Sequence, residues 1–342
     1  MANVTIKDVA ERAKVSTATV DRVLHNRSGV SSIARKRVKE AIHDLGFGQL
    51  PGSLVRHARG RLKFLFLLPV LDTGFVRQII EAIRRAQSAV TDVEIRVEII
   101  RIDLQNGNEL IEALANAPAG TYDGIGLFAI DAPGVRAAID DAADRGIPVV
   151  TLVSDVPSSA RASFAGIDNV AAGRTAGRLM GRFLGCESGE IGVIAGNMNI
   201  RDHVERHMGF RQVLGANYRN LTTLFPLEGD SVAARNKTLV LDLIRKHERL
   251  VGLYAIGGGN TGIIAALQGL ASSRRPVTIV HEATPDTKRA LNSELIDAVV
   301  GQDAGHIARS AVRQLTALAL GDVTNPEQEH IRIDIFLAEN LT

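Results

Sequence analysis

The spacing of apolar positions changes near residue 63, and the change predicts two kinds of structure. Before that point, short apolar stripes such as 9–13 and 20–24 recur with helical spacing. After it, runs that are apolar throughout, such as 64–68 and 148–153, alternate with stretches of helical spacing. Uninterrupted apolar runs separated by helices are typical of parallel strands that are covered on both faces.

The first 46 residues carry start signals for three short helices. Thr5 followed by Asp8 resembles a capping box, and Ser16 and Ser31 stand where they can cap a second and a third helix. We expect the third helix to bury Ile33 with its other apolar residues. Two short helices joined by a tight turn and supported by a third form a helix-turn-helix, which places one helix end in a DNA major groove.

The distribution of charge supports contact between this segment and a polyanion. The whole chain has a net charge of +2, but residues 1–63 hold 13 Lys and Arg against 5 Asp and Glu, or +8. The remaining residues hold 27 against 33, or −6. A basic segment joined to a mildly acidic body is typical of a protein that meets nucleic acid only through the basic part.

The rest of the chain predicts an α/β body with two doubly wound lobes, each a parallel sheet between helices. We expect strands at 64–68, 94–101, 124–129, 148–153, 191–195, 222–226, 251–256, 277–281 and 298–301. This length is too great for one such sheet. After a headpiece (1–46) and a linker (47–62), the effector and dimerisation domain (63–342) is expected to divide into lobe 1 (63–161 plus 293–322) and lobe 2 (162–292 plus 323–342).

Polar side chains follow nearly every predicted strand. Because ligands of open α/β sheets lie beyond the carboxyl ends of the strands, these side chains predict a binding cleft. The candidates are Asp72, Phe75, Asp131, Arg201, Asn260, Glu282 and Gln302, with Asp202 and His281 as weaker ones. Donors and acceptors beside one aromatic ring suit a polyhydroxylated ligand, whose hydroxyls bond to the polar groups while its C–H face packs on the ring.

Four stretches in the first 46 residues carry a family resemblance. Val4-Thr-Ile-Lys-Asp-Val-Ala, Val15-Ser-Thr-Ala-Thr-Val, Arg22-Val-Leu and Val30-Ser resemble the DNA-binding headpiece of the LacI/GalR transcription regulators. The resemblance implies that Thr17, Ala18 and Arg22 face base edges and that Thr5, Ser16, Thr19, Asn26 and Ser31 hold phosphates. Asp21 replaces the Ser of many members, so the resemblance does not give the operator sequence.

The same resemblance implies roles for the linker and the body. In the family, the linker forms a short helix on DNA and inserts a leucine into the minor groove. Leu54 is the candidate here, although Pro51-Gly52 departs from the common pattern. The body resembles the type I periplasmic-binding-protein fold. Its resemblance to sugar-responsive members places Phe75, Asp131, Arg201, Asn260, Glu282 and Gln302 at effector-contact positions.

Two patterns raise enzymatic or metal-binding alternatives. Gly257-Gly-Gly-Asn-Thr-Gly262 satisfies G-x-G-x-x-G after a strand, as in dinucleotide-binding folds. Glu282 lies 20 residues after this motif, about where such folds carry the acidic residue that binds the ribose. No proton-transfer groups accompany it. His203 and His207 lie one helical turn apart, but no third metal ligand is evident. We therefore expect no enzymatic activity, no cofactor and no metal, and keep a solute-binding protein and an NAD-dependent oxidoreductase as alternatives.

These features together predict a cytoplasmic, homodimeric transcription regulator, most simply a repressor. The dimer would bind double-stranded operator DNA through two headpieces, because one helix-turn-helix reads few base pairs. It would bind a sugar or polyol through its body. The lone Cys186 cannot form an internal disulfide, and no apolar run reaches the ~18 residues that span a bilayer. We therefore expect no membrane association. Induction and corepression both remain open.

Overall fold

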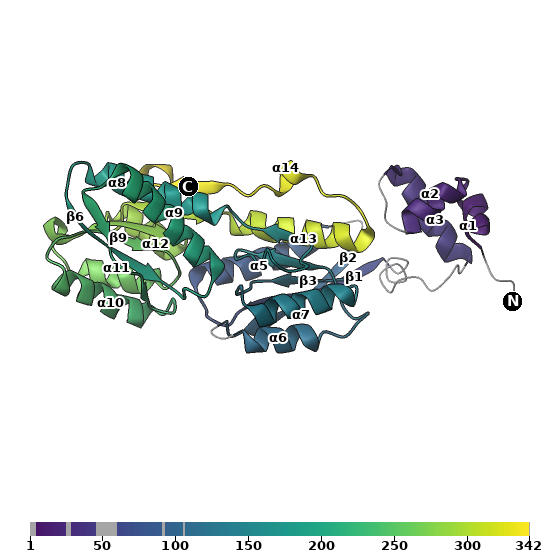
Figure 1. The fold of residues 1–342 in the computed structure, drawn as a ribbon, viewed down its shortest axis with the longest axis horizontal. Helices are drawn as coiled ribbons and strands as arrows, with labels where there is room; N and C mark the ends of the chain where they lie inside the picture. Colours follow the sequence, from purple (N-terminus) through teal and green to yellow (C-terminus); the bar gives the residue numbers. More distant parts are fainter. Residues whose placement is uncertain (1–4, 25–28, 46–59, 91–92, 105–106, 342) are drawn as a thin grey trace.

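The computed structural model describes residues 5–24, 29–45, 60–90, 93–104 and 107–341. Three helices form a headpiece, and the rest of the described chain forms two α/β lobes (Figure 1). The predicted fold class is confirmed, because short N-terminal helices precede two sheets with helices on both faces.

The headpiece helices pack around a small apolar core. They are α1 (Ile6–Ala13), α2 (Thr17–Leu24) and α3 (Ser32–Leu45). The left-handed backbone of Lys14, with φ of 54°, ends α1 and starts the tight turn into α2. Ile33 is 66% exposed, contrary to our expectation. It lies five residues before the buried Val38, or about 140° around the helix, and so it faces away from the core.

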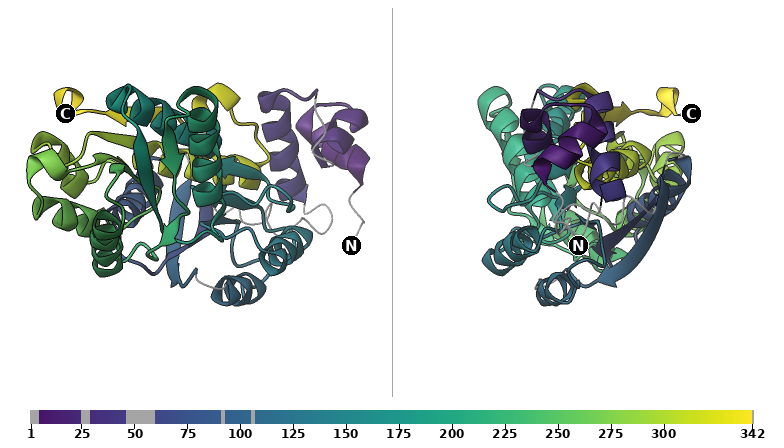
Figure 2. Two further views of the ribbon diagram at one scale, coloured as in Figure 1. Left: turned by 60° about the vertical axis from the view of Figure 1, so that its left-hand side comes forward. Right: turned by 90° about the vertical axis from the view of Figure 1, so that its right-hand side faces the viewer.

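The first lobe is a five-stranded parallel sheet with the order β2-β1-β3-β4-β5. Its strands are β1 (Arg61–Pro69), β2 (Glu94–Ile102), β3 (Gly124–Leu127), β4 (Val149–Leu152) and β5 (Ser163–Ala165). Helices α5 (Gly74–Ala89) and α13 (Ala304–Leu320) cover one face. Helices α6 (Asn108–Ala115) and α7 (Pro133–Asp144) cover the other, as Figure 2 shows.

Strand β1 shows why an uninterrupted apolar run predicts such a strand. Phe64, Phe66 and Leu68 belong to the apolar cluster shared with α5 and α13. The alternating residues Leu65 and Leu67 belong to the cluster on the opposite face, with α6 and α7. Because helices cover both faces of the sheet, both sets of side chains are buried and no polar position interrupts the run.

The second lobe has the strand order β12-β11-β10-β9-β6-β7, with β8 also paired to β6. Its strands are β6 (Gly189–Ala195), β7 (Leu221–Thr223), β8 (Leu227–Glu228), β9 (Leu250–Ala255), β10 (Val277–His281), β11 (Ala298–Gln302) and β12 (Ile333–Phe336). Helices α8 (Asn169–Leu184) and α9 (Arg201–Asn217) cover one face. Helices α10 (Ala233–Lys246), α11 (Asn260–Gln268) and α12 (Pro285–Asn292) cover the other. The short helix α14 (Pro326–Glu329) precedes β12, and 3-10 turns occupy Ser272–Arg274 and Ala338–Asn340.

The nine expected strands are all present, and three further strands are short. The additional strands are β5, β8 and β12, of three, two and four residues. Strand β12 runs antiparallel to β11 at the edge of the second sheet. Three of its residues are partly buried and Ile335 is exposed, and Asp334 interrupts the continuous apolar run that is typical of a strand covered on both faces.

The chain passes between the lobes at three places. The first passage follows Ala165, because β5 pairs with β4 in the first sheet. The second follows Gln302 and not residue 293, because β11 lies between β10 and β12 in the second sheet. The third follows α13, since β12 again belongs to the second sheet.

Glycines allow the backbones of helices α8 and α9 to lie in close contact. A Cβ added to Gly173 would lie 2.0 Å from the carbonyl oxygen of Arg206, and one added to Gly209 would lie 2.1 Å from that of Val170. Because these carbonyl oxygens belong to the backbone of the opposite helix, they could not rotate away from an added Cβ as a flexible side chain could. These two glycines therefore allow the short distance between α8 and α9.

We expect Gly173→Ala to destabilise the protein by about 1–3 kcal/mol, because the added methyl group forces the two helices apart. Gly215→Ala on α9 is the matched control, since no atom lies within 4 Å of its added Cβ. The control should be neutral or stabilising by about 0.5–1 kcal/mol, as is usual for Gly→Ala inside a helix. Urea unfolding of both variants measures the difference, and equal stabilities would contradict the close packing.

Candidate effector cleft and DNA-binding surface

A cleft lies between the two lobes, at the carboxyl ends of strands from both sheets. It has two adjoining chambers with volumes of about 250 and 230 Å³. Phe75 of the first lobe and Ser231 and Glu282 of the second line both chambers. We call the larger one the first chamber, which also contains Phe128 and Arg206, and the smaller one the second chamber, which also contains Asn260.

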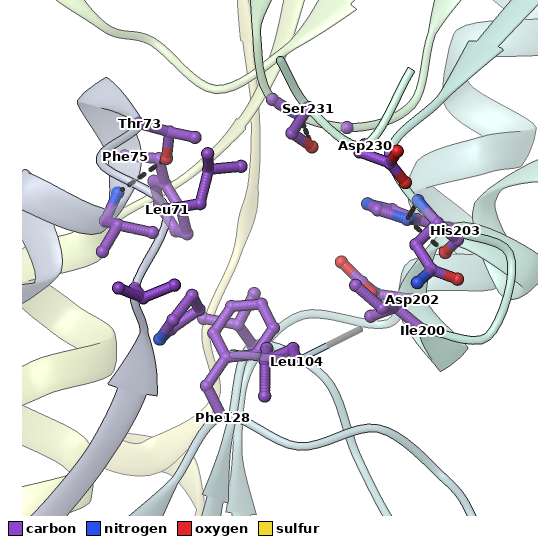
Figure 3. Close-up of a pocket in the computed structure, with 18 of the residues that line it drawn as sticks. Leu71, Thr73, Phe75, Leu104, Phe128, Ile200, Asp202, His203, Asp230 and Ser231 are labelled. Atoms are coloured by element: carbon purple, nitrogen blue, oxygen red, sulfur yellow. Dashed lines mark hydrogen bonds between the residues drawn. The ribbon is translucent and has the colours of Figure 1, made fainter. Parts of the chain in front are cut away.

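The first lobe contributes a mainly apolar wall to the first chamber. Leu71, Leu104 and Phe128 follow β1, β2 and β3 respectively, so three neighbouring strands deliver them to one edge of the sheet. Phe75 joins them from the first turn of α5, which Thr73 caps by accepting a hydrogen bond from the N–H of Val76 at 3.2 Å. Figure 3 shows these side chains across the cavity from the polar residues of the second lobe.

The second lobe contributes a polar wall built around the guanidinium of Arg206. This residue on α9 is 2% exposed. It donates to Asn169 Oδ1 at 2.9 Å and to the carbonyl oxygen of Ile256 at 3.0 Å. Its Nη2 lies 3.5 Å from Glu282 Oε1 and 3.7 Å from Asp202 Oδ2. Two carboxylates therefore share one buried guanidinium.

Glu282 is held in an unusual backbone conformation at the end of β10. Its φ of 72° lies in the left-handed region, which costs free energy for a residue with a side chain. Gln302 donates to its Oε1 at 2.9 Å, while its Oε2 is buried without a partner among the described atoms. Burial raises the pKa of Glu282 to about 7, despite the opposing effects of Arg206 and Gln302.

The structure brings four of the seven predicted effector residues to the cleft. Phe75 and Glu282 line both chambers, and Asp72 and Asn260 line the second. Gln302 lines neither chamber and instead holds the carboxylate of Glu282.

The other two predicted residues, Asp131 and Arg201, form an ion pair between the lobes. Arg201 Nη1 at the start of α9 donates to Asp131 Oδ2 at 3.0 Å. Arg136 also donates to Asp131, at 2.6 Å, and Arg201 to Glu205, at 2.7 Å. Burial acts to raise the pKa of Asp131, but the hydrogen bonds and charges of Arg136 and Arg201 together outweigh it and lower that pKa. Neither Asp131 nor Arg201 lines a chamber.

The strand-end rule missed several residues of the cleft. Arg206 lies inside α9, beyond the reach of that rule, and the one signal for it is its position one helical turn after Asp202. Ser231 lies in a turn of left-handed residues and accepts a hydrogen bond from the N–H of Gly258 at 3.1 Å. Phe128 is one residue past β3 and carries no polar signal.

The glycine-rich turn after β9 serves close packing. Gly257 and Gly258 line the first chamber, and a Cβ on Gly262 would lie 1.8 Å from the carbonyl oxygen of Ala233 at the start of α10.

His203 has its Nδ1 2.8 Å from the carbonyl oxygen of Asn197. Within the described residues, no three His, Cys, Asp or Glu side chains are grouped as a metal site requires.

In the headpiece, most predicted DNA-contact residues lie on the surface. Thr5, Ser16, Thr17, Ala18, Arg22 and Ser31 are exposed, and Thr19 is half-buried. The hydroxyls of Thr5, Ser16 and Ser31 accept hydrogen bonds from backbone N–H groups of the first helical turns at 3.4, 3.1 and 3.2 Å. Asn26 and Leu54 lie outside the described residues.

Both parts of the chain match family models. Residues 5–48 match the model for bacterial regulatory proteins of the lacI family, and residues 64–322 match that for a periplasmic binding protein domain. The chain belongs to the lacI family of DNA-binding transcription regulators. The regulator has an effector domain like those of sugar-binding proteins, and regulators of this family are not enzymes. None of its described helices is long and apolar enough to cross a membrane.

Individual relatives match different parts of the regulator. The ribose import binding protein RbsB of Escherichia coli K12 is 26% identical over 225 residues, which cover 64% of this chain and 74% of that protein. The transcriptional repressor CytR of the same strain is 41% identical over 80 residues, or 23% of each chain. The structure of GanP, a glucose-galactose binding protein from Geobacillus stearothermophilus, superposes with a TM-score of 0.73 at 20% identity, over 82% of this chain and 99% of that one. This likeness shows the fold of the body.

The raised pKa of Glu282 predicts a pH-dependent stability. The unfolded chain ionises this carboxyl near its ordinary pKa of 4.5, whereas the folded chain does so only near pH 7. The folded state is therefore favoured at low pH, and this contribution is lost as pH rises from about 4.5 to 7, by up to about 3 kcal/mol.

We expect Glu282→Gln to abolish this loss, so that the variant gains stability relative to the wild type as pH rises over that window. Denaturant unfolding between pH 4.5 and 8 measures the trend. Glu187→Gln, at an exposed position, is the control for loss of one carboxyl group and should follow the wild type. A parallel course of wild type and Glu282→Gln would contradict the role of burial.

Proposed function

We propose that the regulator is a homodimeric repressor whose affinity for operator DNA is controlled by a sugar or polyol in the cleft. The observation that carries the proposal is the pairing of two unlike walls in the first chamber. Phe75 and Phe128 lie on the apolar wall, and Asp202, Arg206 and Glu282 lie on the polar one. Sugar rings have a C–H face and a rim of hydroxyls, so they match both walls.

The relatives support the same ligand class. Ribose, glucose and galactose appear in the names of the proteins RbsB and GanP. The predicted contacts Asp72, Phe75, Asn260 and Glu282 line the cleft and are proposed to touch the effector directly. Gln302 is proposed to act through Glu282, to which it donates a hydrogen bond.

The headpiece is proposed to read DNA through exposed side chains of α2. Thr17, Ala18 and Arg22 would face base edges, with the guanidinium of Arg22 suited to a guanine. The other predicted residues, Thr5, Ser16, Thr19, Asn26 and Ser31, would contact phosphates, since N–H groups and hydroxyls at helix starts suit phosphate oxygens. Leu54 remains the candidate for minor-groove insertion. Two such heads on a near-palindromic site require a dimer.

Coupling between the two functions would use the relative position of the lobes. The linker to the headpiece joins the first lobe at β1, while the polar wall belongs to the second lobe. A ligand that contacts both walls favours an arrangement in which the two lobes are close together. The Asp131–Arg201 ion pair, which joins the lobes, favours the same arrangement. The change in operator affinity equals the difference in ligand affinity between the two arrangements, commonly about 1–3 kcal/mol.

We expect the purified full chain to select a near-palindromic duplex from a randomised library and to release it when a cognate sugar is added. A sugar at 100 times its dissociation constant should stabilise the protein by ~2.7 kcal/mol in a thermal-shift measurement. Fluorescence anisotropy of the selected duplex should then show about a 5- to 150-fold loss of affinity. Tighter DNA binding with sugar would indicate corepression, and no response to any sugar or polyol would refute effector control.

We expect Arg22→Ala to relax base preference at one position of each half-site, at a cost of about 1–3 kcal/mol on the preferred sequence. Arg37→Ala, an exposed position on α3, removes the same charge from the headpiece. It should weaken binding to all duplexes alike, because Arg37 lies on α3 and not on α2. Competition between the selected duplex and single-base variants separates the two effects, and unchanged base preference in Arg22→Ala would exclude it as a base reader.

A further inference from the structure

The cleft carries more acidic than basic side chains. Six acidic residues line the two chambers: Asp72, Asp103, Asp202, Asp230, Glu282 and Asp286. The basic residues among the lining positions are Arg77 and Arg206. Asp230 and Asp286 are paired with Arg235 and Arg289, which line neither chamber. Asp202 and Glu282, in contrast, share the single guanidinium of Arg206.

Both lining arginines are already engaged by protein acceptors. Arg77 Nη1 donates to the carboxylate of Asp72 at 2.7 Å and to its carbonyl oxygen at 3.1 Å. Arg206 donates to Asn169 and Ile256 and directs its remaining nitrogen to its two carboxylates. A phosphate or carboxylate entering the cleft would therefore have to displace these partners to obtain a charged hydrogen bond.

The buried polar atoms without a partner in the cleft are oxygens. They are Oδ1 of Asp202, Oε2 of Glu282 and Oδ1 of Asn260, in residues that are 3%, 7% and 8% exposed. Buried acceptors are normally satisfied, and leaving one without a donor is costly. Hydroxyl or ammonium groups of a ligand can donate hydrogen bonds to these three oxygens. Ionised phosphate and carboxylate oxygens cannot, because they carry no hydrogen to donate.

Helix starts at the second chamber are the one feature that favours an anion. Gly74 of α5, Ala233 of α10 and Asn260 of α11 line it, and N–H groups at helix starts attract negative charge. Asp72 and Asp286 line the same chamber. Their carboxylates offset the positive ends of the helices, so the chamber does not present an uncompensated anion site.

We propose that the effector is a polyhydroxylated compound without negative charge, neutral or amine-bearing, and that the cleft rejects phosphorylated and acidic sugars. Its hydroxyl or ammonium groups donate to Asp202, Glu282 and Asn260. This inference rests on the proposed function, because it specifies the chemistry of the ligand in the same cleft.

The test compares matched compounds on the full chain. Ribose, arabinose, glucose and galactose are titrated beside the corresponding polyols, amino sugars, uronic acids and phosphate esters, with dissociation constants measured by calorimetry after a thermal-shift screen. We expect the tightest binding from a neutral or amino compound. Its uronic acid or phosphate ester should bind at least 100-fold more weakly.

A charge-neutral variant tests whether the carboxylates produce this selectivity. Glu282→Gln should lower the ratio of neutral-sugar to uronic-acid affinity at least 10-fold, because it removes the repulsion while keeping the shape. Asp242→Asn is the matched control, since Asp242 on α10 is paired with Arg245 and lines neither chamber. Its ratio should equal that of the wild type. A merely structural defect in Glu282→Gln would weaken both ligands and leave the ratio unchanged, which would overturn the proposal.

The remaining outcomes separate this inference from the proposed function. If a phosphate ester or uronic acid binds as tightly as its neutral parent or more tightly, the inference is wrong, while control by an effector stands. If no compound of any class binds or changes operator affinity, the proposed effector control fails and the inference fails with it.

Discussion

The fold of the body depends on the hydrogen bonds and ion pairs around the buried guanidinium of Arg206. A buried charge without partners costs several kcal/mol, so Asn169, Ile256, Asp202 and Glu282 must all keep their places around it. These partners come from helices α8 and α9 and from the ends of strands β9 and β10. The close approach of α8 and α9 therefore follows from the same constraint that shapes the polar wall of the cleft.

The hydrogen bonds around this guanidinium extend to both lobes. Asn169, which accepts from Arg206, donates to the carbonyl oxygen of Val153 at the end of β4 in the first lobe, at 3.4 Å. On the other side, Glu282 is held by Gln302, the last residue before the chain returns to the first lobe. Val153 and Glu282 share a left-handed backbone, with φ of 64° and 72°. Both residues line the first chamber, so two strained backbone positions lie at the wall of the cleft.

The sequence was informative wherever local spacing decides structure. Apolar runs located nine strands, and strand ends located Phe75 and Glu282, because a parallel sheet delivers its loops to one edge. Arg206 and the Asp131–Arg201 pair could not be found in this way, since they depend on how distant helices meet. Ile33 was misjudged for a related reason, because only the packed headpiece determines which helical face is inside.

Strand β12 supports the residue that holds Glu282 at the wall of the cleft. Ile333 of β12 is the antiparallel partner of Gln302, and Phe336 packs against Gly301, where an added Cβ would lie 2.9 Å from its ring. A truncation before Ile333 would leave every residue that lines the two chambers in the chain, yet would remove the pairing partner of β11, whose last residue Gln302 holds Glu282. In the repressor proposed above, such a truncation would leave the headpiece intact but weaken the response to the effector, which is the phenotype of a super-repressor.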